Sequence, residues 1–419
     1  MRRTTVAVLA SATAVFAAVA AYAATQHAPQ SPDRISTTPL VPASARLTAV
    51  SPAIGLRPGA ASPVAAGYAA AVAAIPKLTA LQLAGQRVIY SYAGKTPPAG
   101  LLWLIRHGEA AGVIFFTENI GTTAADLANF RAVVNELQQA AKSPLNPVHE
   151  PLLLMTDQEG GIVRRLPGPP LLSEKQVGSS ATPQRTATRQ STAAGTYLHS
   201  FGLNVNLAPV LDVYRQPGNF IDQYGRSFSN RPGRVAKLGQ LYVTAEQGKG
   251  VATTVKHFPG LGAATRSQNT DLGPVTLSLS LSQIRTVDEA PYTSAIAAKT
   301  KLVMVSWAIY TALDSSHPAG LSGTIIRGEL RKRLGFAGVT IPDALEAGAL
   351  KPFGTTGHRA RLAGGAGMDL LLCGARNYLE GDAAMHALEG AYTSGTPAYQ
   401  AAFKAAAERV IALRATLPA

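Results

Sequence analysis

Short apolar stretches alternate with longer amphipathic stretches along the chain, from about residue 87 to the C-terminus. The short stretches have the length and the aliphatic content of buried strands. Several of them end abruptly at Gly or Pro residues, which typically begin a loop. The eight predicted strands are residues 87–92, 112–116, 152–157, 205–212, 253–258, 301–307, 338–343 and 368–373.

Helices are predicted between most of these strands. The helix predicted at residues 123–142 is preceded by Thr122 and opens with Thr123, a good N-cap, and it carries Asp126 in the first turn. The other clear helical patterns are residues 232–247, 281–299 and 399–417. A strand–helix unit repeated about eight times predicts an α/β fold of the (β/α)8 TIM-barrel type in a single domain. A doubly wound open sheet is the alternative, but no strand is followed by a Gly-rich dinucleotide-binding loop.

The N-terminal region differs from the rest of the chain. Arg2 and Arg3 precede an apolar stretch at residues 6–23 that ends in small residues, as in an export signal. The apolar stretch is nearly long enough to span a membrane, so an uncleaved anchor is the alternative. We expect a signal peptide at residues 1–24, a flexible linker rich in Pro, Ala, Ser and Thr at 25–70, and the barrel domain at 71–419. The protein is expected to be secreted or associated with the cell envelope.

Composition adds a few limits. The 419 residues carry a formal net charge of +14, but Lys and Arg are scattered, without a dense basic run that includes aromatic residues. Nucleic-acid binding is therefore not expected. The charge fits association with an anionic cell envelope, and it also fits no specific partner. Cys373 is the only cysteine and lies in an apolar stretch, so we expect a buried thiol without an intrachain disulfide. Nothing indicates an oligomer, and a monomer is expected.

Polar side chains follow several predicted strands at the point where each strand ends. In a parallel barrel the C-terminal ends of the strands surround one pocket, where such enzymes carry their active site. The pair at the end of the fifth strand, Lys256 and His257, is followed at once by Pro259 and Gly260. The residues at these strand ends are Asp157, Asp212, Lys256, His257, Ser306, Trp307 and Asp343.

Several of these residues also have a purely structural interpretation. Asp157 could cap the turn that follows it, and Asp212 could hold a loop through backbone amides. His257 could be a hydrogen-bonded core histidine. Asp343 could cap the next helix, with Glu346 three residues later as in a capping box. Spacing alone leaves both interpretations open.

Three motifs go further, because their order and spacing resemble a known family. They are Asp-Gln-Glu-Gly-Gly-Ile-Val-Arg-Arg at residues 157–165, Lys-His-Phe-Pro-Gly at 256–260, and the segment 339–348 around Asp343. Together they resemble the N-terminal barrel of glycoside hydrolase family 3, in its single-domain β-N-acetylhexosaminidase branch. The resemblance covers roughly residues 78–417.

The resemblance implies a retaining glycosidase. Asp343 would attack the anomeric carbon and form a covalent glycosyl-enzyme. Asp157 would accept hydrogen bonds from sugar hydroxyls. The donors to sugar oxygens would be Arg165, Arg226, Lys256 and His257. The family implies no metal or organic cofactor, and the expected substrate is a β-linked glycan, with peptidoglycan fragments as the leading candidate.

The sequence departs from the family pattern at the proton donor. The hexosaminidase branch uses an Asp-His dyad in the loop after Lys-His-Phe-Pro-Gly, and in register the two positions are Ser267 and Asn269. Neither can donate a proton near neutral pH. Asp271 is the nearest carboxyl, and burial could raise its pKa enough for it to serve as the acid. The alternatives are an acid from a partner subunit, a branch with a different substrate, and a carbohydrate-binding or catalytically degenerate barrel.

Overall fold

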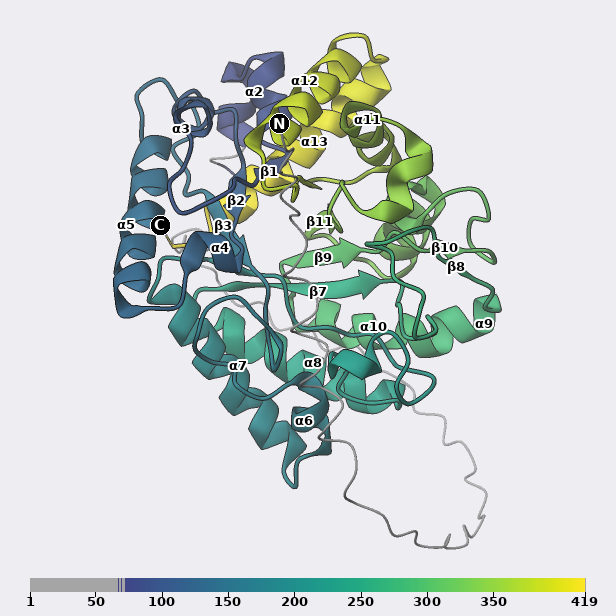
Figure 1. Ribbon diagram of the computed structural model, residues 1–419. Helices are drawn as coiled ribbons and strands as arrows, with labels where there is room; N and C mark the ends of the chain where they lie inside the picture. Colours follow the sequence, from purple (N-terminus) through teal and green to yellow (C-terminus); the bar gives the residue numbers. More distant parts are fainter. Residues whose placement is uncertain (1–66, 68, 70–71, 419) are drawn as a thin grey trace, which may run out of the picture. The chain divides into compact units, whose positions relative to one another are not determined.

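A parallel sheet of eight strands forms the centre of the protein (Figure 1). The computed structural model describes residues 67, 69 and 72–418. The predicted signal peptide lies outside the described residues, as does the predicted linker apart from residues 67 and 69. Each strand overlaps one of the eight predicted stretches. The strands are β1 (Val88–Tyr90), β2 (Gly112–Ile114), β3 (Leu153–Thr156), β6 (Val205–Asn206), β7 (Ala252–Phe258), β9 (Leu302–Val305), β11 (Val339–Pro342) and β12 (Leu371–Leu372).

The order of the strands confirms the predicted barrel. Each strand lies beside the next one of the set along the chain, and every pair within the sheet is parallel. The two edge strands of the sheet, β11 and β12, come together where the Leu370 N–H donates to the Thr340 carbonyl at 2.9 Å. The sheet is therefore a nearly closed (β/α)8 barrel. A short antiparallel hairpin, β4 (Gln158–Gly160) with β5 (Val163–Arg164), follows β3.

Helices cover the outside of the sheet (Figure 1). The predicted cap of α5 is present, since Thr123 and Asp126 each accept the other's backbone N–H at 3.1 Å. The predicted helix at 281–299 is a composite, because a π-helical segment at Ile284–Asp288 separates α9 from α10. Among the described residues the α-helices are α2 (Ala80–Gly85), α3 (Ala99–Arg106), α4 (Thr117–Ile120), α5 (Ala124–Ala141), α6 (Glu174–Ser179), α7 (Pro183–His199), α8 (Pro232–Gln247), α9 (Leu281–Gln283), α10 (Ala290–Ala297), α11 (Thr356–Ala366), α12 (Tyr378–Thr393) and α13 (Pro397–Arg414), and a second π-helical segment is Thr324–Arg333.

Strand side chains alternate between two apolar layers. In β1, Val88 and Tyr90 pack toward the helices, and Ile89 belongs to a second cluster inside the barrel. The inner cluster also contains Ile114, Leu207, Met304 and Leu372, which form the floor of the site described below. Cys373 is buried, as predicted. None of the described helices has the length and apolar character needed to cross a membrane.

Candidate active site

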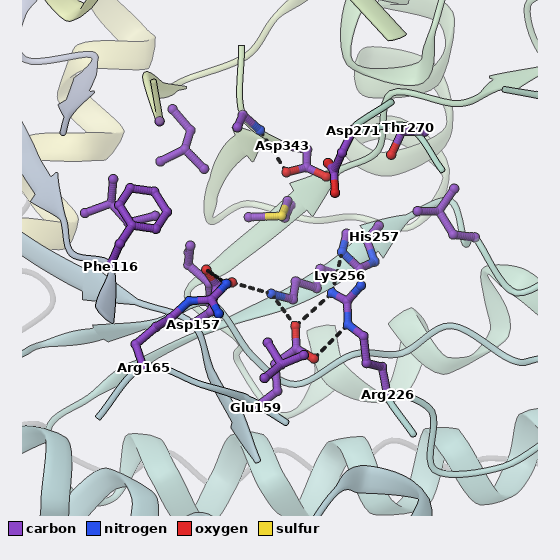
Figure 2. A pocket seen from close by; sticks show the side chains of 18 of the residues that line it. Phe116, Asp157, Glu159, Arg165, Arg226, Lys256, His257, Thr270, Asp271 and Asp343 are labelled. Carbon is purple, nitrogen blue, oxygen red and sulfur yellow. Dashed lines mark hydrogen bonds and ion pairs between the residues drawn. The ribbon is translucent and has the colours of Figure 1, made fainter. Parts of the chain in front are cut away.

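A cavity of about 280 Å³ lies at the C-terminal ends of the barrel strands. All seven residues to which catalytic or sugar-binding roles were assigned line it, although they come from the end of β7 and from different βα loops. Those residues are Asp157, Arg165, Arg226, Lys256, His257, Asp271 and Asp343. Figure 2 shows their side chains around the cavity. Within the described part of the chain, no three His, Cys, Asp or Glu side chains are grouped so as to hold a metal ion.

Lys256 is the centre of the charged cluster on one side of the cavity. Its Nζ atom lies 2.8 Å from Asp157 Oδ1 and 2.8 Å from Glu159 Oε1, and the side chain is 2% exposed. Burial lowers the pKa of Lys256, but the two carboxylates outweigh it and raise that pKa overall. Burial likewise opposes ionisation of Asp157, yet Lys256 and Arg165 keep its pKa below the usual range. The strand-end lysine therefore has partners, as expected for a buried ammonium group.

Glu159 links this cluster to Arg226 and was not among the predicted site residues. The Arg226 guanidinium donates through Nε to Oε2 at 2.9 Å and through Nη2 to Oε1 at 2.8 Å. Burial disfavours the carboxylate, but Arg226 and Lys256 hold the pKa of Glu159 far below its usual range. Glu159 therefore stays ionised and positions two cations, which excludes it as a proton donor. The sequence could have identified Glu159 as a site residue, because Glu159 lies in the motif at 157–165.

Asp212 holds the end of β7 through His257 and does not line the cavity. Its Oδ2 atom is 2.7 Å from His257 Nδ1, and its Oδ1 atom accepts the backbone N–H groups of His257 and Leu261. The structural interpretation of Asp212 is therefore correct. His257 Nε2 lies 3.2 Å from Arg226 Nη2, which can only donate. This geometry makes Nε2 an acceptor and assigns the imidazole proton to Nδ1.

Asp343 and Asp271 lie across the cavity from the lysine cluster and point toward one another (Figure 2). Asp343 follows β11 directly, and its Oδ1 atom accepts the Ala344 N–H at 2.8 Å. No helix begins there, because a turn and then a 3-10 helix at Gly348–Phe353 follow, so the helix-cap interpretation of Asp343 is wrong. Burial of its carboxyl and the nearby Asp343 raise the pKa of Asp271, although the residue as a whole keeps much solvent-exposed surface.

Glu346 is a second carboxyl near Asp343, and the sequence suggested only a capping role for it. It lines the cavity, and its Oε2 atom accepts the Gly374 N–H at 3.1 Å. Burial, Glu380 and Asp343 together raise the pKa of Glu346 to about 7, even though the residue is also partly open to solvent. Ser267 and Asn269, at the two dyad positions, are not among the residues that line the cavity.

Replacing Lys256 with Met is expected to destabilise the protein by about 3–5 kcal/mol, because it leaves buried carboxylates without their shared cation. The pKa values of Asp157 and Glu159 are lowered in the folded state, so the stabilisation is present above the unfolded carboxyl pKa of about 4. It is lost as the pH falls below that value. Urea unfolding at several pH values should therefore show the largest difference from wild type above about pH 5.

The matched control for this experiment is Lys95→Met. Lys95 also pairs with a carboxylate, that of Asp126, but its side chain is 47% exposed. An exposed pair contributes little to the free energy of unfolding, because solvent screens it. Equal losses in the two variants, or a loss in Lys256→Met that does not shrink at low pH, would contradict the buried-cluster account.

Comparison with known proteins identifies relatives of the whole barrel. Residues 97–413 match the family model described as the glycosyl hydrolase family 3 N terminal domain. A protein of Arthroderma benhamiae named an uncharacterized secreted glycosyl hydrolase is 45% identical over 337 residues, which are 80% of this chain and 93% of the relative. Beta-hexosaminidase A of Pseudoalteromonas piscicida is 33% identical over 316 residues, 68% of this chain and 51% of the relative.

The fold also matches a solved structure. A glycoside hydrolase family 3 β-N-acetylglucosaminidase from Paenibacillus sp. str. FPU-7 superposes with a TM-score of 0.74 at 33% sequence identity. The match covers 81% of this chain and 63% of the Paenibacillus chain. The present chain thus spans about half to two thirds of these two longer relatives, and nearly all of the Arthroderma protein.

Proposed function

The chain belongs to glycoside hydrolase family 3, and we propose that it is an exported retaining β-glycosidase that removes N-acetylhexosamine units from the ends of β-linked glycans. The β-hexosaminidase relatives and the β-N-acetylglucosaminidase structure support the substrate class. Export is supported by the signal-like pattern of residues 1–24 and by the name of the secreted Arthroderma relative.

One observation carries the proposed mechanism: two carboxyl groups, those of Asp343 and Asp271, face one another across one side of the cavity (Figure 2). A retaining glycosidase needs an ionised nucleophile and a protonated acid on opposite faces of the scissile bond. Asp343 emerges directly from the end of β11 on a segment fixed by backbone hydrogen bonds, as suits a nucleophile. The raised pKa of Asp271 keeps its carboxyl protonated to higher pH, as suits an acid.

In the first step Asp343 attacks C1 of the sugar, and the bond from C1 to the leaving oxygen breaks. That oxygen takes the proton of Asp271, which becomes a carboxylate. In the second step the Asp271 carboxylate removes a proton from water, the water oxygen attacks C1, and the bond from C1 to Asp343 breaks. The product keeps the β configuration and both carboxyl groups return to their starting states.

The sugar would be held by the lysine side of the cavity. Asp157 lies where it can accept hydroxyl hydrogen bonds, while Lys256 and Arg165 hold its carboxylate in place. The apolar floor of barrel side chains would contact the ring faces. Because this floor closes the cavity from below, a glycan would enter by its end, and the enzyme would release single sugars.

A substrate panel tests the proposal. We expect the purified protein to hydrolyse 4-nitrophenyl β-N-acetylglucosaminide with a kcat/KM at least about 10-fold above that for the β-glucoside, because its relatives are named for N-acetylhexosaminide substrates and a site built for an amide discriminates against its absence. In cultures of the native host, the same activity is expected in the medium or the cell envelope. Glycan binding without hydrolysis at any pH from 4 to 9 would instead favour the degenerate barrel.

A further inference from the structure

The loop that carries Asp271 is fixed at both ends by backbone contacts. At its start, the Gly262 carbonyl accepts the Arg215 N–H at 2.9 Å and the Asn219 Nδ2 atom at 2.7 Å. At its end, the loop is held by the segment that follows Asp343. The Gly348 N–H donates to the Asp271 carbonyl at 2.9 Å, and the next residue's N–H donates to the Thr270 carbonyl at 2.9 Å.

The contact between Gly348 and the end of the Asp271 loop depends on the absence of a side chain at Gly348. A Cβ atom there would overlap the carbonyl carbon and oxygen of Leu272 and would lie 2.8 Å from the Asp271 carbonyl oxygen. The backbone of Gly348 is not in the left-handed region, so close approach and not conformation requires the glycine. Any larger residue would push the loop away from Asp343, because the overlap is with backbone atoms.

Asn269 orients the backbone at the end of the loop. Its Oδ1 atom accepts the Asp271 N–H at 2.8 Å, and its carbonyl accepts the Leu272 N–H at 3.1 Å. The side chain thereby fixes the backbone at Asp271 in a local turn. Asn269 occupies the second dyad position but cannot supply the proton itself. It instead contacts Asp271, the residue that we assign as the acid.

We propose that Gly348 and Asn269 are positioning residues, which hold the Asp271 carboxyl in reach of the leaving oxygen before substrate binds. The proposal rests on the acid role of Asp271 given above. It predicts that loosening either contact impairs protonation of the leaving group and leaves attack by Asp343 intact. Substrates that need no protonation should then be hydrolysed normally.

The test compares two leaving groups in Gly348→Ala and Asn269→Ala. For the phenyl β-N-acetylglucosaminide, whose leaving group needs a proton, we expect kcat/KM to fall about 10²-fold in Gly348→Ala, as for a small misplacement of a catalytic group. Asn269→Ala should lose about 5-fold, since it removes the one hydrogen bond between the Asn269 side chain and the Asp271 N–H. For the 2,4-dinitrophenyl glycoside, both should stay within about 3-fold of wild type, because little acid assistance is needed.

Gly273→Ala is the matched control. It makes the same Gly-to-Ala substitution in the loop that carries Asp271, but a Cβ atom there meets nothing within 4 Å, so both substrates should be hydrolysed as by wild type. In an Asp271→Asn background, Gly348→Ala should cause no further loss, since the two residues act through one carboxyl. Thermal melting of each variant checks folding, and Asn269→Ala keeps the test open if Gly348→Ala does not fold.

The outcomes separate this inference from the assignment of the acid. Equal losses on both substrates, or no loss in either variant, would overturn the positioning roles while Asp271→Asn still discriminates between leaving groups. If Asp271→Asn itself shows no discrimination, the acid assignment fails and the positioning roles fail with it.

Discussion

Replacing Asp343 with Asn is expected to lower kcat/KM for aryl β-N-acetylglucosaminides by roughly 10⁴–10⁶-fold, the range seen when a hydrolase loses a residue of its nucleophilic machinery. Asn keeps the size of the side chain and an oxygen that can still accept the Ala344 N–H. The loss should therefore reflect the missing nucleophile and not a disturbed fold. Other single substitutions in the cavity are expected to lower kcat/KM less, because only Asp343 forms a covalent bond to the sugar.

Two measurements check this prediction. A slowly hydrolysed 5-fluoro glycosyl fluoride should add one glycosyl unit to the wild-type protein, located by peptide mass spectrometry at Asp343, and none to Asp343→Asn. NMR of the first product should show the β anomer, as a double displacement requires. Full activity of the variant, label on another residue, or an α product would each remove Asp343 from the role of nucleophile.

Replacing Asp271 with Asn is expected to lower kcat/KM for the phenyl glycoside by roughly 10²–10⁴-fold, the usual contribution of general acid catalysis. With the dinitrophenyl glycoside, the first step should be much closer to the wild-type rate, because this leaving group needs little protonation. Its glycosyl-enzyme would then persist, because no base activates water. Added azide should restore turnover by attacking C1 directly, and the product would be the β-glycosyl azide.

The pH profile gives a second readout for Asp271. The first step needs its protonated form, so kcat/KM should fall as the pH rises through the pKa of this carboxyl. Burial and Asp343 raise that pKa, which shifts the alkaline decline to higher pH than an ordinary aspartate would allow. In Asp271→Asn the alkaline decline should disappear.

Glu346→Gln is the control for this pH profile, because the pKa of Glu346 is raised to about 7 and it would titrate in a similar range. We expect the variant to retain the alkaline decline and the leaving-group dependence of wild type. Loss of the decline in Glu346→Gln, together with its persistence in Asp271→Asn, would transfer the acid role to Glu346.

Much of the fold followed from the sequence because strand and helix periods are local properties. The buried strand around Thr254 and Val255, stopped by Pro259 and Gly260, was visible in a few residues. The π-helical segment at Ile284–Asp288 was not, since one wider turn of 5 residues is too short to change the helical pattern around it.

The site could be predicted in part for a related reason. In a parallel barrel a residue at the end of a strand lies at the rim, so Asp157, Lys256 and Asp343 were expected together before any contact was known. Glu159 and Glu346 were missed as site residues because their roles depend on partners far away in the sequence. Arg226 holds Glu159 from 67 residues away, and Gly374 binds Glu346 from 28 residues away.

By itself, the sequence determined the barrel, the family and the absence of the usual Asp-His pair, since each is encoded in local patterns and short motifs. Only the tertiary structure decided what Asp271 faces and what holds it. The loop from Leu261 to Gly273 has no regular secondary structure, and its place is set by contacts with Arg215, Asn219 and Gly348. Such contacts depend on the nearly closed barrel, which brings the ends of β6, β7 and β11 around one cavity.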